Sequence, residues 1–211
     1  VMLSSAAKEY LKVYGVLVGK KPLVFTNNDS GYETAIEFKK NGINPIVLDT
    51  RKDPNSEIIK EAKALNINIK PSYVVVAAKG YKKVNSADIA KISDDKKNIT
   101  NIENIKCDCI CVSGFWTPTI HLASQSGNKT KFNEEIDAFI PSQPKQKETT
   151  LGSANGIFTL EETLKTSFEK GNDLSKQITN KENKFPIPSV VEKKSSNHDK
   201  FWCVPLPEGK N

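Results

Sequence analysis

One stretch of the sequence reads Pro22-Leu-Val-Phe-Thr-Asn-Asn-Asp-Ser-Gly31, a short apolar run followed by a polar, turn-rich loop. Residues 32–40 then carry apolar side chains at helical spacing, so the order is strand, loop, helix. A dinucleotide-binding fold carries its G-x-G-x-x-G fingerprint at this place, and here only the third glycine, Gly31, is present. The stretch predicts a Rossmann-like α/β fold with an altered phosphate loop.

The segments around this stretch extend it to a larger sheet. Residues 3–14 have the apolar stripe of a helix, residues 45–49 form a second apolar strand, and residues 55–65 form a second amphipathic helix. Two parallel strands joined by a helix make a βαβ unit. Residues 66–69 can add a third short strand.

A β-meander is expected after the βαβ unit. Residues 73–78 and 82–92 have the pattern of a hairpin that turns about Lys79-Gly80. Residues 107–113 form one more apolar strand, which ends in the turn Gly114-Phe-Trp-Thr-Pro118. These segments complete a predicted α/β sheet.

The last part of the chain is more polar in composition than the segments before it. Residues 142–150 are polar and predict a surface loop, and Gly152-Ser-Ala-Asn-Gly156 is expected to open a last helix. The N–H groups there could meet a phosphate or a neighbouring domain, and a simple capped turn is the alternative. Residues 172–211 are rich in Lys, Asn, Ser and Pro and predict an extended or partly disordered arm.

The loop after the first strand is a candidate nucleotide site. Its candidate cofactor-binding residues are Thr26, Asn27, Asn28 and Asp29. Asp49 ends the second strand, about 20 residues further on, where an acid would accept a hydrogen bond from the ribose 2′-OH. In the alternative interpretation the loop side chains cap the helix and Asp49 is a loop residue near Arg51.

Three cysteines alternate along the strand predicted at residues 107–113. Cys107, Cys109 and Cys111 are therefore expected on one face, as small buried side chains. Zinc sites usually use C-x₂₋₄-C spacing and four ligands, and only His121 is near enough in sequence to help. We therefore predict no metal site at these cysteines, with a metal or redox site as the alternative. Neither His121 nor His198 has an evident nucleophile partner, so we also predict no catalytic residue.

The turn at 114–118 allows two interpretations. Open α/β sheets place ligands at the carboxyl ends of their strands, so this turn could contact a ligand. In the other interpretation it is a structural corner with Trp116 in the core.

Composition and charge exclude some classes of function. The chain has 211 residues and a net charge of +6, but Arg51 is its only arginine and the lysines are scattered, which argues against a nucleic-acid partner. The longest apolar run, Tyr73-Val-Val-Val-Ala-Ala78, is too short to span a membrane. Four unevenly placed cysteines indicate a reduced, cytoplasmic setting. The sequence opens without Met at position 1 and without a signal peptide, and we expect it to be an excerpt of a longer chain.

Four stretches of the chain resemble one known family. They are Tyr10–Gly15, Val24–Tyr32, Val112–Ser126 and Ala154–Phe158. In this order they are similar to an internal part of the α subunits of heterotetrameric sarcosine oxidases, over residues 1–171.

The resemblance implies an architecture similar to disulfide oxidoreductases, with one Rossmann-like FAD/NAD(P)-binding domain inserted into another. Residues 1–15 would be a leading helix from the outer domain and 16–105 the inserted domain. Residues 106–171 would be the return segment, and 172–211 a linker or arm toward a folate-binding domain. In that scheme the cofactor-facing residues of the outer domain are Ser113, Gly114, Asn155 and Gly156.

The resemblance also implies an activity for the parent complex. It is the oxidative demethylation of sarcosine with transfer of the one-carbon unit to tetrahydrofolate, giving glycine and peroxide. NAD would bind the intact α subunit, with Asn155 standing where flavin-binding proteins commonly have Asp. FAD and FMN would belong only to the parent complex, with FMN between the α and β subunits. The chain alone is expected to be inactive.

Partners and alternatives follow from the same scheme. The partners would be the other subunits, and the isolated chain is expected to form a homo-oligomer or to fold its tail back. Either would cover apolar side chains at Phe115, Trp116, Leu122 and Ile157. A stand-alone pyridine-nucleotide oxidoreductase or electron-transfer subunit would have an intact G-x-G-x-x-G or C-x-x-C, which the sequence lacks. A protein-interaction module differs from the first hypothesis only in whether a nucleotide binds.

Overall fold

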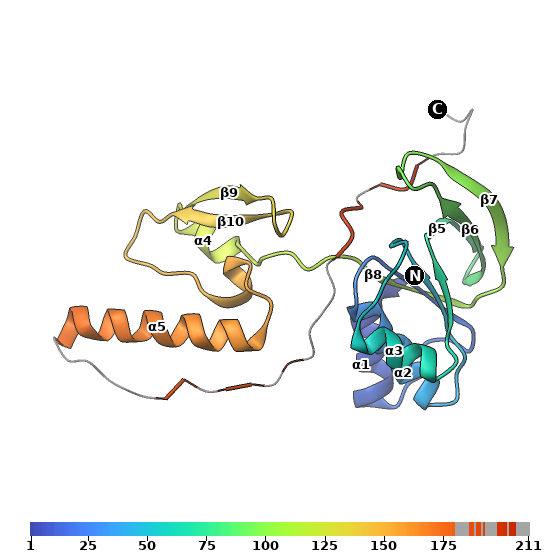
Figure 1. The fold of residues 1–211 in the computed structure, drawn as a ribbon, viewed down its shortest axis with the longest axis horizontal. Helices are drawn as coiled ribbons and strands as arrows, with labels where there is room; N and C mark the ends of the chain where they lie inside the picture. The colour runs from blue at the N-terminus through green and yellow to red at the C-terminus, as the bar shows by residue number, and fades with distance from the viewer. Residues whose placement is uncertain (180–185, 188, 191, 193–197, 202, 206–211) are drawn as a thin grey trace. The chain divides into compact units, whose positions relative to one another are not determined.

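The computed structural model describes residues 1–179, 186–187, 189–190, 192, 198–201 and 203–205. The chain divides into two compact units, Val1–Phe115 with Lys193–Asn211, and Trp116–Glu192 (Figure 1). Each unit is described by itself. Among the described residues, no helix combines the length and the apolar character that crossing a membrane requires.

A parallel five-stranded sheet forms the centre of the first unit. Its strands, in the order β1-β8-β2-β3-β4, are Met2–Leu3, Cys109–Ser113, Pro22–Thr26, Ile46–Asp49 and Asn68–Pro71. From β2 the chain adds β3 and then β4 on one side, whereas β8 pairs on the other side. The carboxyl ends of β2 and β8 therefore flank the point where the strand order reverses, which is where such sheets bind ligands. The predicted Rossmann-like α/β fold is confirmed.

Three helices cover one face of this sheet. They are α1 (Ser4–Tyr14), α2 (Ser30–Lys40) and α3 (Glu57–Ala64). Alternate strand residues such as Val24 and Val47 point to this side and pack with Tyr32 and Phe38 of α2 and Ile59 of α3. The predicted helices are confirmed, although α2 begins two residues earlier than the apolar spacing alone suggests.

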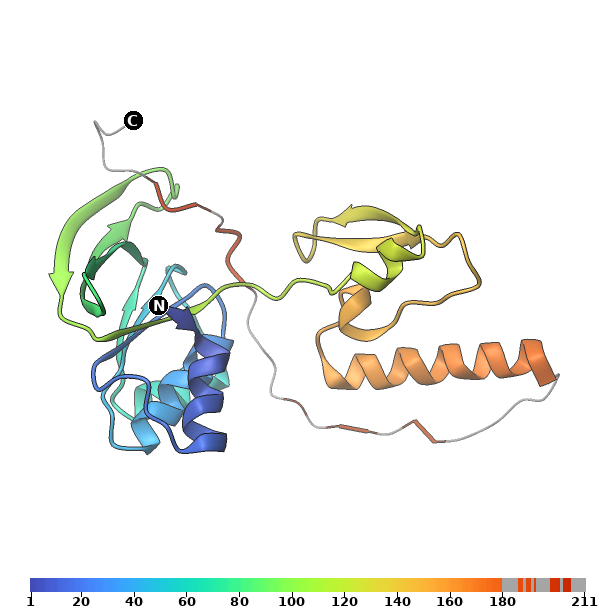
Figure 2. The same cartoon turned by 180° about the vertical axis from the view of Figure 1, so that it is seen from behind.

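An antiparallel meander covers the other face of the sheet (Figure 2). Its strands are β5 (Tyr73–Gly80), β6 (Val84–Ile92) and β7 (Ile99–Ile105). Leu23, Leu48 and Ile110 point to this side and pack against Ala87 and Ile89 of β6. The predicted hairpin is confirmed, with its turn at residues 81–83 rather than at Lys79-Gly80.

Cys107 corrects the prediction that three cysteines share one face. Strand β8 begins only at Cys109, and the N–H of Cys107 binds the carbonyl of Asn85 beside the meander. Cys107 therefore packs on the meander side, whereas Cys109 and Cys111 pack on the helical side with their Sγ atoms 3.7 Å apart. In the described part of the chain, no group of three or more His, Cys, Asp or Glu side chains could hold a metal ion.

The second unit is small. It contains α4 (His121–Gln125), an antiparallel hairpin of β9 (Lys129–Asn133) and β10 (Ala138–Gln143), a 3₁₀ helix η1 (Gly152–Asn155) and α5 (Leu160–Thr179). Ala123, Ala138 and Ile140 are its buried apolar residues among those described. The carbonyl oxygen of the Asn128 side chain accepts the N–H groups of Ser142 and Gln143, each at 3.1 Å, which joins the loop after α4 to the end of the hairpin. This hairpin was not among the elements predicted from the sequence.

The segment Gly152–Gly156 does not open the last helix, contrary to the prediction. It forms η1, which ends at Gly156 with φ at 81°, and α5 begins only at Leu160. The first N–H groups of α5, of Leu160 and Glu161, bind the Glu192 carboxylate at 2.8 and 3.2 Å. All residues of α5 are described, none is buried, and the helix continues through residues 172–179, where an extended arm was predicted.

The predicted division into residues 1–15, 16–105, 106–171 and 172–211 stays a prediction. The parallel sheet takes strands from the first three of these segments: β1, then β2 to β4, then β8. Strand β8 lies between β1 and β2, so it is an inner strand of this sheet.

Candidate functional site

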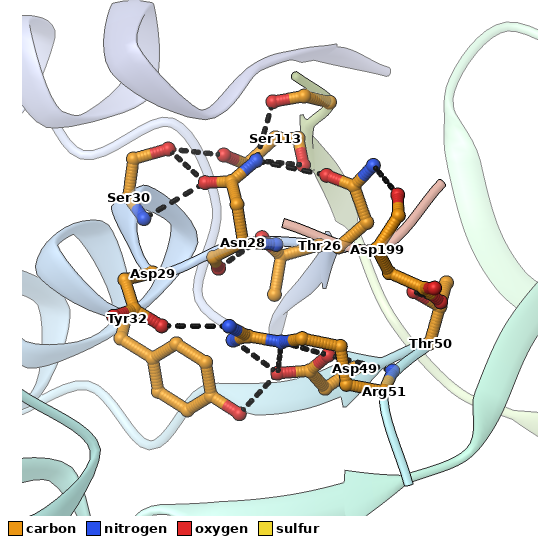
Figure 3. Close-up of polar contacts among 12 residues, drawn as sticks. Thr26, Asn28, Asp29, Ser30, Tyr32, Asp49, Thr50, Arg51, Ser113 and Asp199 are labelled. Carbon is orange, nitrogen blue, oxygen red and sulfur yellow. Dashed lines mark hydrogen bonds and ion pairs between the residues drawn. The ribbon is translucent and has the colours of Figure 1, made fainter. Parts of the chain in front are cut away.

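Strand register brings three sequence-predicted residues into one row. Thr26 at the end of β2 pairs with Asp49 of β3 on one side and with Ser113 of β8 on the other. Because the strands are parallel, their carboxyl ends share one edge, where the close-up in Figure 3 shows these side chains. The candidate site lies at this edge.

The Asn28 side chain fills the loop between β2 and α2. Its amide NH₂ donates to the carbonyl oxygens of Ser113, at 3.4 Å, and Gly114, at 2.5 Å, and to Oδ1 of Asn27 at 2.8 Å. Its Oδ1 accepts the backbone N–H of Ser30 at 2.9 Å and the Ser30 hydroxyl at 2.5 Å. A dinucleotide fold directs such N–H groups at the pyrophosphate, whereas here the Asn28 carboxamide takes the N–H of Ser30 (Figure 3).

Gly31 lies directly against the strand that precedes the loop. A Cβ atom added to Gly31 would come within 2.6 Å of both Cβ and Oγ1 of Thr26. Oγ1 of Thr26 also donates to the carbonyl oxygen of Asn28 at 2.8 Å, which closes the turn. The glycine kept from the fingerprint is thus the one that allows the helix to pack closely on the strand.

Asp49 is fully buried and tied into an ion-pair cluster. Its carboxylate accepts the backbone N–H of Arg51 at 2.9 Å, Nε of Arg51 at 3.0 Å, Nη2 of Arg51 at 2.8 Å and the Tyr32 hydroxyl at 2.7 Å. Nη1 of Arg51 reaches Oδ1 of Asp29 at 2.8 Å. The alternative interpretation of the sequence placed Asp49 near Arg51, and the structure shows this contact. Asp29 and Tyr32 also belong to the cluster. Nothing in the sequence pattern identifies Tyr32 as a partner of Asp49.

Burial and the neighbouring Asp49 carboxylate raise the pKa of Tyr32 above its ordinary value, because both disfavour the phenolate. The Tyr32 hydroxyl is therefore held as a hydrogen-bond donor to Asp49. With these donors in place, Asp49 acts in the structure as the counter-charge of Arg51. Its predicted role toward a ribose hydroxyl stays a prediction.

The described tail residues lie at the same edge. Asn27 accepts the backbone N–H of Asp199 at 2.9 Å and donates its side-chain amide to the Asp199 carbonyl at 3.0 Å. The Thr50 hydroxyl donates to Oδ2 of Asp199 at 2.8 Å, and Lys96 forms an ion pair with Oδ1. Sequence patterns do not predict the contacts of Asp199, Thr50 and Lys96, because no local pattern joins residues so far apart in the chain.

The turn after β8 was predicted either to contact a ligand or to be a structural corner with Trp116 in the core. Ser113 and Gly114 lie at the site and accept hydrogen bonds from Asn28, but their contact with a cofactor stays a prediction. Trp116 is 55% exposed, so the interpretation that placed it in the core is wrong. Asn155 and Gly156 belong to the second unit, and their predicted cofactor role with Ser113 and Gly114 also stays a prediction.

The predicted apolar face has mixed exposure. Leu122 is 85% exposed like Trp116, whereas Phe115 and Ile157 are half-buried. The tail folds back onto another surface than the predicted face: Phe201 and Val204 pack against a buried cluster of the meander, and of the four predicted residues only Phe115 is contacted in the described tail, by the ring of His198. Trp202, which the prediction also named, lies outside the described residues.

The chain is similar in sequence to three curated relatives, all of them sarcosine oxidase α subunits. One from a Corynebacterium species is 25% identical over 211 residues, which is 99% of this chain and 22% of that relative. One from Rhizobium meliloti is 31% identical over 156 residues, which is 73% of this chain and 15% of that relative. A second Corynebacterium strain gives 27% identity over 79% of this chain and 17% of the relative. The chain thus spans 15–22% of the length of these relatives, and no family model matches it.

Solved structures share the fold. An HOCl-induced flavoprotein disulfide reductase from Escherichia coli gives a TM-score of 0.55 at 11% identity, over 75% of this chain and 36% of that one. A 2-naphthoyl-CoA reductase gives 0.53 at 14% identity, over 77% and 22% of the two chains. Sequence and fold agree with the resemblance given by the four stretches: the chain is similar in sequence to part of the sarcosine oxidase α subunits and has a Rossmann-like α/β fold like that of FAD/NAD(P)-dependent disulfide oxidoreductases.

Proposed function

We propose that the chain is a dinucleotide-type domain of a sarcosine oxidase α subunit and that it has no catalytic residue of its own. The observation that carries this is the loop from Thr26 to Ser30, where Asn28 takes the helix N–H that a pyrophosphate would need. The buried Asp49–Arg51 pair supports it, since a carboxylate already bound by Arg51 and Tyr32 has little capacity left for a ribose hydroxyl.

The intact protein would oxidise sarcosine and transfer its one-carbon unit to tetrahydrofolate, giving glycine and peroxide. The names of the curated relatives support the oxidation step. In this proposal FMN lies between the α subunit and a partner subunit, FAD belongs to the parent complex, and NAD binds the intact α subunit. The chain acts in the cytoplasm, with the other oxidase subunits as its partners.

An activity assay and an absorption spectrum test this proposal. The purified chain is mixed with sarcosine and oxygen, peroxide is measured, and the visible spectrum of the protein is recorded. We expect no peroxide and no flavin band near ~450 nm, because the flavin-proximal groups lie elsewhere in the parent complex. A yellow preparation, or peroxide formed in proportion to the chain, would contradict the proposal.

The state of association of the isolated chain is a second part of the proposal. Exposed apolar side chains of the first unit include Leu3 of β1 and Val13 and Tyr14 of α1. Burying such surface at ~25 cal/mol/Å² favours self-association, so we expect a homodimer or larger assembly. Light scattering that gives the mass of one chain at ~100 μM would be inconsistent with it.

A further inference from the structure

The segment from His198 to Val204, apart from residue 202, lies on the carboxyl edge of the parallel sheet. The backbone of Asp199 forms two hydrogen bonds with Asn27, which follows β2: its N–H donates to the Asn27 carbonyl, and its carbonyl accepts the Asn27 side-chain amide. The ring of His198 stacks on that of Phe115, which follows β8, with 3.5 Å between the ring centroids. The tail segment therefore lies beside the carboxyl ends of β2 and β8, the position at which open α/β sheets bind ligands.

The Asp199 carboxylate is held as a ligand would be. Its side chain is 8% exposed, one oxygen accepts the Thr50 hydroxyl at 2.8 Å and the other pairs with Lys96. Thr50 is itself buried, and its N–H binds the carbonyl of Thr26, so the hydroxyl is fixed beside the candidate site (Figure 3). A hydroxyl and an ammonium group that converge on one carboxylate are suited to any small oxyanion.

Lys96 is placed by a tight turn between β6 and β7. Ser93 donates its N–H to the Asn98 carbonyl, and the N–H of Lys96 binds the Ser93 carbonyl, each at 2.9 Å. Lys96 has φ at 58°, in the left-handed region that a lysine seldom adopts. The turn therefore fixes the backbone of Lys96 at a position from which its side chain reaches Asp199.

A hollow of about 270 Å³ adjoins this contact. Its lining residues are Thr50, Lys52, Ser72, Ile92, Ser93, Asp94 and Lys96. Lys52 and Asp94 form an exposed pair at its rim, so their charges offset each other. Lys96 is offset by Asp199, and removal of that carboxylate leaves a hydroxyl-lined hollow with one additional positive charge.

We propose that residues 198–201 and 203–204 form an intrachain latch whose Asp199 carboxylate occupies an oxyanion site made by Thr50 and Lys96, and that the site takes a phosphate group when the latch is released. Phe201 and Val204 hold the latch, because they pack against the buried cluster that includes Val74 and Ile92. This inference goes beyond the proposed function and does not depend on it, since it concerns anion binding rather than sarcosine oxidation.

The test compares phosphate binding by the full chain and by Asp199→Ala. Inorganic pyrophosphate is titrated into each protein and binding is followed by calorimetry. We expect Asp199→Ala to bind pyrophosphate at least ~10-fold more tightly than the parent chain, since charge-assisted hydrogen bonds to Lys96 become available. The double variant with Lys96→Met is expected to lose this gain. No gain in Asp199→Ala would overturn the proposal.

The matched control is Asp94→Ala, which changes the net charge equally at the rim of the same hollow and leaves the latch in place. An equal gain in Asp94→Ala would show a general charge effect and overturn the site.

A measurement on the parent chain avoids the variants: saturating pyrophosphate should increase hydrogen exchange in the peptide covering residues 198–204, and unchanged exchange would overturn the latch. A parallel titration with ADP separates the two sources of phosphate, because tighter binding of ADP indicates a nucleotide and equal binding a free anion.

Discussion

Oδ1 of Asn28 accepts both the backbone N–H and the hydroxyl of Ser30. One side chain thus closes the start of α2 and, through its NH₂ group, joins it to the end of β8. The loop holds its shape by its own side chains where a dinucleotide fold uses bare glycine backbone.

Replacing Asn28 by Ala should lower the free energy of unfolding by about 2–3 kcal/mol. The change removes several buried hydrogen bonds and leaves the N–H of Ser30 and the Gly114 carbonyl without this partner. Urea denaturation followed by circular dichroism measures the effect. Asn85→Ala, at an exposed asparagine, is the control and should change stability by less than ~0.5 kcal/mol. Equal effects in the two variants would contradict the role given to Asn28.

Gly31→Ala should destabilise the first unit by about 1–3 kcal/mol. The new methyl group would lie 2.6 Å from Cβ of Thr26, so the helix must move away from the strand. Gly171→Ala in α5 is a matched control, because a Cβ there meets no atom within 4 Å among the described residues. The control should be neutral or slightly stabilising, since alanine is the better helix former. Denaturation midpoints distinguish the two, and a neutral Gly31→Ala would refute the packing argument.

Tyr32 should make the stability of the first unit fall at alkaline pH. Its folded-state pKa is raised by burial and by Asp49, whereas the unfolded chain ionises near the ordinary value of 10.0. Above pH ~10 the unfolded state alone loses the proton, so stability declines by up to ~1.4 kcal/mol per pH unit. Below pH ~10 this contribution is fully present.

Tyr32→Phe removes that titration and provides the comparison. Its unfolding free energy should fall less steeply than that of the parent chain between pH 10 and 11, although it starts lower because the hydrogen bond to Asp49 is lost. The other tyrosines and the lysines are common to both proteins. Parallel pH profiles would show that Tyr32 does not keep its proton in the folded state.

Alkylation of the native chain should be confined to Cys203. Cys203 is exposed, whereas Cys107, Cys109 and Cys111 are buried, and the hydrogen bond with Cys109 together with burial raises the pKa of Cys111. Mass spectrometry after brief iodoacetamide treatment should find one modified site. Cys203→Ser should then stay unmodified until denaturant is added. Rapid native labelling of Cys109 or Cys111 would be contrary to this expectation.

The sequence predicted the elements whose side-chain period is regular. The apolar runs of β2 and β3 could be recognised without tertiary information, because their side chains are buried on both faces of the sheet. The spacing in α1 also predicts the helix, although Ala7 is the one fully buried apolar residue of that stripe. Strand β7 was missed because it is an edge strand of the meander with mostly exposed polar residues, so it has no alternating apolar pattern.

The candidate site was predicted in position but not in detail. The loop after β2 and the acid after β3 follow from the order of elements, whereas the Tyr32 hydrogen bond to Asp49 depends on how α2 packs on the sheet. The Asp199 contact with Thr50 joins residues 149 positions apart, and nothing local in the tail distinguishes that aspartate from its neighbours. Cys107 was misplaced because the alternation of a strand was extended two residues beyond its start.

The place of β8 between β1 and β2 has a consequence for the order in which the chain folds. β2 can pair with β3 early in synthesis, but its other edge has no partner until residues 109–113 have been made, after the whole meander. The strand at residues 2–3 has to wait for the same segment, because β8 is its pairing partner. Contacts this distant in sequence slow folding. A nascent chain that does not yet include residues 109–113 therefore exposes this edge of β2, where another unpaired strand could bind.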